Sequence, residues 1–321
     1  MTTSEELQPA SGPLAGWAAR LLAAARVASD NGELWLPGAL ATMSSIGWLP
    51  FVLAVIPLPS DGDLAFFASS LVLAPSYPLN IVLPAVALVC AVACATLLSA
   101  AGEAVLLRAI GRLRGRGSAQ TSIDDEAVRV WLIRLVASLP VMVVIGLLLV
   151  MIRAVGPGEY QSPDLGRGPL LVRIAADVWP IFILGAVAIA SGQAFAAAAL
   201  RANLGAAVSI PSALGMGLRD LVRHPLQRLS QSVAVEAGLA AWLVATWALL
   251  RLLWIPIGRH AQDGTLMTPV SLALLVGFVA IWLCLVAGAG VLHVWSSAWW
   301  SLEDSEAGTV RLGRNDGEPW T

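Results

Sequence analysis

Five polar side chains interrupt the apolar stretches of the sequence, each about one helical turn from the end of its stretch that is expected at the cytoplasmic boundary. They are Glu103, Arg134, Gln193, Glu236 and His293. Ionisable groups inside a membrane are costly, so they mark either paths for solutes and protons or groups that satisfy one another. These five residues form the candidate polar layer of the chain.

Two interpretations of the polar layer are open. In the first, it surrounds a cavity that opens to the cytoplasm, where Glu103 and Glu236 receive a cation or a proton and Arg134 balances their charge. In the second, one of the carboxylates pairs with Arg134 to hold the helices in register, while Gln193 and His293 add hydrogen bonds. Side chains this near the interface can also reach water, which favours the second interpretation.

The remaining polar groups predict no catalytic residue, metal site or cofactor. Arg173 and Asp177 are four residues apart, a spacing that predicts an ion pair on one helix face at the outer end of a span. Cys90 and Cys94 share a helix face, but no further metal ligand lies at their depth. The chain also lacks a phosphate-binding glycine loop and a zinc-peptidase motif.

Tryptophan is unusually frequent, with 13 Trp against two Tyr. Three of them, Trp295, Trp299 and Trp300, follow His293 at the end of an apolar stretch. Such a cluster could surround a pigment or haem. A belt that anchors the helix end at the membrane interface is the commoner arrangement, and it is the one we expect here.

These groups must be positioned by membrane helices. Hydrophobic residues make up 58% of the 321 positions and charged residues 12%, about half the charge of a typical soluble domain. Apolar runs of roughly 20 residues alternate with charged loops. The sequence predicts an all-α fold, a polytopic transmembrane bundle of about six spans with interfacial amphipathic helices. The predicted spans cover residues 35–56, 81–106, 130–152, 178–200, 233–257 and 269–295.

Arginine in the loops predicts the orientation of the chain. The loops after the second and fourth spans are rich in Arg, whereas the segment between the first two spans has none. Because cytoplasmic loops carry the excess of positive charge, both termini are expected in the cytoplasm of a bacterium, with the chain in its inner membrane. We expect a cytoplasmic segment with an interfacial helix over 1–34, the spans over 35–300, and a disordered polar tail over 301–321.

Two segments, 14–29 and 211–229, have the periodicity of helices that lie in the membrane interface; simple connectors are an equal alternative. Pro225 is expected to divide the second segment into two short helices. The even spacing of the first, third and fifth spans suggests three copies of a unit made of an interfacial segment and two spans.

Small residues recur every four positions along the second, fourth and sixth spans. The stripes are Ala87, Ala91, Ala95 and Ser99; Ala188, Gly192 and Ala196; and Ala280, Cys284 and Gly288. Such stripes let helix backbones approach closely in lipid. We therefore expect these three spans to meet at the centre of the bundle, with the other three outside.

The stretch Ser209-Ile-Pro-Ser-Ala-Leu-Gly-Met-Gly-Leu-Arg-Asp-Leu-Val-Arg-His-Pro225, followed at once by a long apolar span, resembles a recurring pattern. It is similar to one found in six-helix bacterial membrane families of unknown function, including the membrane domain attached to some glycerophosphodiester phosphodiesterases. The resemblance covers about fifty residues. It implies a six-helix fold, and without a soluble phosphodiesterase domain it implies no catalysis.

Two functions are compatible with these observations. The short loops and the lack of a catalytic motif favour a non-catalytic scaffold, assembly factor or accessory subunit that acts through the lipid bilayer or through other membrane proteins. The alternative is a transporter or channel subunit for a small solute or ion that uses the polar layer near the inner leaflet. No nucleic-acid partner is expected.

Overall fold

The computed structural model describes residues 13–56, 75–113, 122–161, 170–206, 209–264 and 268–312, together with the single positions 62, 66 and 70. These residues form helices and turns, and no strand occurs among them. The helices are α1 (Pro13–Asp30), α2 (Trp35–Thr42), α3 (Leu49–Val55), α5 (Leu79–Leu113), α6 (Ile123–Gln161), α7 (Leu170–Asp177), α8 (Trp179–Ala206), α9 (Ile210–Arg223), α10 (Pro225–Gln262) and α11 (Pro269–Leu312).

Five helices are long and apolar enough to cross a membrane: α5, α6, α8, α10 and α11. A sixth crossing results if the bent pair Gly32–Gly47 and Leu49–Val55, whose axes differ by 45°, forms one span. Large apolar side chains face outward along these helices, as lipid-solvated surfaces require. The predicted all-α membrane bundle is confirmed.

The first apolar stretch is a broken helix. Between α2 and α3 the backbone forms the π-helical segment η2 (Met43–Gly47). Ser45 donates hydrogen bonds to the carbonyls of Ala41 and Thr42, at 2.9 and 3.1 Å, and Thr42 donates to Gly38 at 2.9 Å. Side chains that bond back to the preceding turn bend helices, and Pro50 lies in the first turn of the next helix, which begins at Leu49. The break follows from these residues together.

Pro225 separates two helices, as predicted, but only the first of them is short. Helix α9 ends at Arg223, whereas Pro225 opens the 38-residue α10. Proline suits the first turn of a helix, where its missing N–H costs nothing. Of the polar tail expected to be disordered over 301–321, the part up to Leu312 continues α11 as helix, and residues 313–321 lie outside the described part of the chain.

Contacts between the helices close them into a ring that follows the chain order. Contacts join α2 to α5, α5 to α6, α6 to α8, α8 to α10, and α10 to both α3 and α11, and α11 returns to α2. The expectation that the second, fourth and sixth spans meet at the centre is therefore wrong. The predicted threefold repeat stays a prediction.

The small residues instead allow close contact between helices that are adjacent in the ring. Ser99 on α5 donates to the Ala41 carbonyl on α2 at 2.8 Å. A Cβ added to Gly192 on α8 would lie 2.5 Å from the Ala137 carbonyl on α6, and one added to Gly288 on α11 would collide with Trp242 on α10. Each stripe thus brings one helix close to an adjacent helix.

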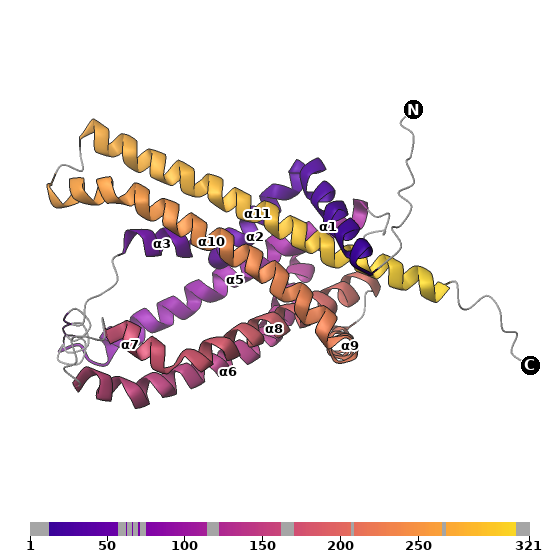
Figure 1. Ribbon diagram of the computed structural model, residues 1–321, viewed down its shortest axis with the longest axis horizontal. Helices are drawn as coiled ribbons and strands as arrows, with labels where there is room; N and C mark the ends of the chain where they lie inside the picture. Colours follow the sequence, from indigo (N-terminus) through magenta and orange to yellow (C-terminus); the bar gives the residue numbers. More distant parts are fainter. Residues whose placement is uncertain are drawn as a thin grey trace, which may run out of the picture.

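The amphipathic helices α1 and α9 lie at one end of the bundle, and α3 and α7 lie at the other (Figure 1). Helix α1 packs against α11, where Ala24 and Ala28 join Trp299 in a buried cluster. The Trp299 side chain is 2% exposed. The tryptophan cluster is thus part of the α1–α11 core, and its interpretation as an interfacial belt is wrong for this residue.

Candidate functional site

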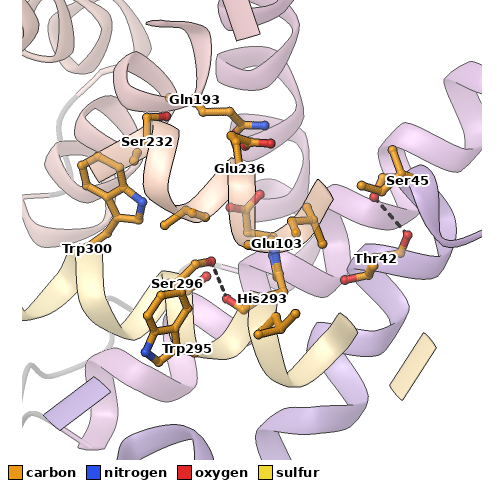
Figure 2. Close-up of a pocket in the computed structure, with 18 of the residues that line it drawn as sticks. Thr42, Ser45, Glu103, Gln193, Ser232, Glu236, His293, Trp295, Ser296 and Trp300 are labelled. Atoms are coloured by element: carbon orange, nitrogen blue, oxygen red, sulfur yellow. Dashed lines mark hydrogen bonds between the residues drawn. The ribbon is translucent and has the colours of Figure 1, made fainter. Parts of the chain in front are cut away.

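A cavity of about 370 Å³ lies inside the ring, in the half of the bundle that carries α1 and α9. Its wall includes all five residues of the predicted polar layer, namely Glu103, Arg134, Gln193, Glu236 and His293. They come from α5, α6, α8, α10 and α11, and the broken first helix adds Thr42 and Ser45. Figure 2 shows Glu103, Gln193, Glu236 and His293 directed toward the same space between the helices.

Glu103 and Arg134 form a salt bridge across the α5–α6 contact. The Glu103 side chain is 7% exposed, whereas that of Arg134 is 29% exposed and lies on the cavity wall. Arg134 also lies within electrostatic range of Glu236 and His293. Pairing cancels the charge of Glu103 and explains how a buried carboxylate is stabilised at this depth.

Four other polar side chains in the wall have no hydrogen bond or salt bridge to the described residues: Gln193, Ser232, Glu236 and His293. Ser232 is 1% exposed and its hydroxyl lacks a partner. The Nε2 atom of His293 is buried and also lacks one. Buried polar groups are nearly always hydrogen-bonded, so the buried atoms of Ser232 and His293 are unsatisfied. Gln193 is exposed and Glu236 is partly exposed, and all four residues line the cavity.

The cavity wall carries a net negative formal charge. Its charged side chains are Glu103, Arg134 and Glu236, with His293 counted as neutral. Because Glu103 and Arg134 cancel, Glu236 leaves one negative formal charge in the wall that has no salt bridge, although Arg134 lies within electrostatic range of it. Its carboxylate is the strongest hydrogen-bond acceptor available to anything that enters.

Aromatic side chains bound the cavity toward the end of the bundle where α1 and α9 lie. Trp295 and Trp300 line it. The Arg201 guanidinium lies 5.3 Å from the centroid of the Trp300 ring and donates to the Trp300 carbonyl at 2.9 Å. Trp295 donates to the Leu21 carbonyl of α1 at 3.3 Å. Both indoles are therefore held by groups outside the cavity.

The predicted ion pair at the outer end of the bundle does not form. Arg173 on α7 pairs instead with Glu159 on α6, with 3.5 Å between Nε and the carboxylate, and donates to the Glu159 carbonyl at 3.0 Å. Asp177 lies exposed at the end of α7. The contact between α6 and α7 brings Glu159 within reach, and a spacing along one helix cannot predict it.

Two further ion pairs connect helices near the end with α1 and α9. Arg108 on α5 binds Glu126 on α6 at 2.8 Å, and Arg228 on α10 binds Asp220 on α9, also at 2.8 Å. Sequence analysis missed both pairs because each joins residues on different helices. The sequence gives only a weak indication of these two pairs, because Arg is frequent in all of the loops concerned.

An arginine stabilises the other end of the broken first helix. Arg251 on α10 donates to the Ala54 carbonyl in the last turn of α3 at 2.8 Å. Trp282 on α11 donates to the Gly47 carbonyl at 3.1 Å, at the break itself. Carbonyl groups that the broken helix leaves free thus find partners on the neighbouring spans.

The three cysteines are free thiols on exposed surfaces. Within the described ranges, no group of three or more His, Cys, Asp or Glu side chains is arranged to hold a metal ion.

Comparison with known protein families, with curated proteins and with solved structures found no match to this chain. The resemblance of residues 209–225 to six-helix membrane families stays a prediction.

Proposed function

We propose that this protein is a transporter or channel subunit that admits a small solute to the cavity inside its helix ring. One observation carries the proposal: Gln193, Ser232, Glu236 and His293 line one cavity without a hydrogen bond or salt bridge to the described residues. The amide of Gln193 and the carboxylate of Glu236 are accessible there. A solute or water that enters the cavity would form hydrogen bonds with them.

The broken first helix supports this function. Discontinuous membrane helices are common at the binding sites of transporters, and π-helical segments are frequent at functional sites. Here the π segment and its neighbouring turn place Thr42 and Ser45 in the cavity wall. An uninterrupted helix would have no bend at this position.

We place the chain in a bacterial inner membrane, with the bent pair as the first of six spans and both termini in the cytoplasm. The arginine-rich connections after α5 and α8 support this orientation. The cavity lies in the half of the bundle that carries these connections, so its solute would enter from the cytoplasm. The salt bridge of Glu103 with Arg134 then positions α5 against α6 beside the site.

Flux through proteoliposomes tests the proposal. The purified protein is reconstituted, and light scattering follows swelling in gradients of urea, glycerol and methylammonium chloride. We expect at least one solute to enter faster than it enters protein-free liposomes. Gln193→Trp should remove this flux, because the Gln193 side chain lies in the cavity and a larger side chain there fills it.

Val276→Trp is the matched control, because Val276 is 69% exposed on the outer surface of α11. It should leave the flux unchanged. If no solute crosses, or if Gln193→Trp conducts as well as the wild type, transport is excluded. The non-catalytic scaffold predicted from the sequence would then be the better assignment.

A further inference from the structure

The charge of the cavity wall identifies the class of solute. We infer that the cavity binds an organic ammonium ion, whose charged group contacts Glu236 and whose apolar part lies against the tryptophans. This inference rests on the proposed function, since it names the substrate of the same cavity.

The first step concerns charge. Glu236 is the one charged group of the wall that has no salt-bridged counterion among the described residues, because Arg134 pairs with Glu103 and acts on Glu236 only over a longer range. An ammonium ion would supply that counterion and would form charge-assisted hydrogen bonds with the carboxylate. An anion would meet a carboxylate instead, and the Arg134 guanidinium is already engaged.

The second step concerns hydrogen bonding. A primary ammonium group has three N–H donors and no acceptor. Three other unpartnered side chains of the cavity wall can accept: the hydroxyl of Ser232, the amide oxygen of Gln193 and the imidazole of neutral His293. Figure 2 shows Gln193 next to Glu236. Glu103 lies on the other side of Glu236, and His293 lies beside Glu103.

The third step concerns the rest of the ligand. A volume of about 370 Å³ lies within the range of small-molecule sites and far exceeds the needs of a bare ion. The wall also contains apolar side chains, among them Ile189, Leu200 and Leu239, in addition to Trp295 and Trp300. Indole rings attract cations through their faces, so a ligand with both an ammonium and an apolar part matches the lining.

Binding of three compounds of the same shape tests the inference. Benzylammonium, benzyl alcohol and benzoate are titrated into the purified protein in nanodiscs, and calorimetry measures each affinity; potassium chloride serves as the inorganic cation. We expect benzylammonium to bind best. Glu236→Gln should weaken it by about tenfold or more, the effect of losing one charge-assisted hydrogen bond, and should leave benzyl alcohol unchanged.

Glu33→Gln is the matched control, because Glu33 is exposed outside the cavity. Size-exclusion elution confirms that each variant is folded. Preferential binding of benzoate, of benzyl alcohol or of potassium would overturn the inference, and so would a Glu236→Gln protein that binds benzylammonium normally. The proposed function fails separately, through the absence of any flux that Gln193→Trp blocks.

Discussion

Arg201 on α8 lies over the indole of Trp300 on α11, 5.3 Å from the ring centroid, and also binds the Trp300 carbonyl. The same guanidinium donates to the Ala197 carbonyl of its own helix at 2.8 Å. Arg201 therefore fixes an aromatic side chain of the cavity wall against the backbone of a neighbouring helix.

Arg201→Ala should release Trp300 and widen access to the cavity from the end with α1 and α9. The readout is the rate at which a charged thiol reagent modifies Gln193→Cys, in a background with the three native cysteines replaced. We expect the rate to rise several-fold, since the cation–π contact and a hydrogen bond to a charged group are both lost. Arg219→Ala, an exposed position on α9, is the control, and an equal rate in both proteins would refute the idea.

Removal of one partner of the Glu103–Arg134 pair should destabilise the bundle more than removal of both. Arg134→Leu leaves a buried carboxylate unpaired and should cost about 2 kcal/mol, less than a fully buried pair because Arg134 is 29% exposed. The double variant Glu103→Leu/Arg134→Leu should recover part of the loss. Unfolding by SDS, followed by circular dichroism, measures the wild type, the single variants Arg134→Leu and Glu103→Leu, and the double variant. Losses that add up from the two single variants would contradict a direct interaction.

Two glycines provide a matched test of helix packing. Gly192→Ala would place a Cβ 2.5 Å from the Ala137 carbonyl, whereas a Cβ at Gly146 on the adjacent α6 meets no atom within 4 Å. We expect Gly192→Ala to lower the free energy of unfolding by about 1–3 kcal/mol and Gly146→Ala to leave it unchanged or raise it slightly. The same SDS titration distinguishes them, and equal effects would argue against the close crossing of α6 and α8.

Glu159 and Asp177 compete as partners of Arg173, and the structure selects Glu159. Glu159→Gln should increase hydrogen exchange in α7, with a loss of about 1 kcal/mol, because the pair is mostly removed from solvent. Asp177→Asn should leave the exchange of α7 unchanged. Mass spectrometry of peptides from residues 170–177 provides the measurement; the opposite order would restore the intrahelical pair expected from the sequence.

Much of the architecture could be predicted from the sequence because hydropathy alone marks stretches that must lie in lipid. The five polar-layer residues were visible for the same reason: a charged or amide side chain stands out in an apolar run. The sequence did not show which side chains contact each other across different helices. Arg173 and Trp299 have neighbours that depend on how separate helices pack, and the π segment at Met43–Gly47 consists of residues that also suit a regular helix.

The order of helices around the ring bears on how the protein is made. Because α11 must reach α2 to complete the ring, the wall of the cavity is unfinished until the last helix has entered the bilayer. Glu103 gains its partner when α6 follows α5, early in synthesis. Glu236 arrives on α10 before α11 brings His293, so its carboxylate must spend that interval beside lipid, beside water or beside the insertion machinery.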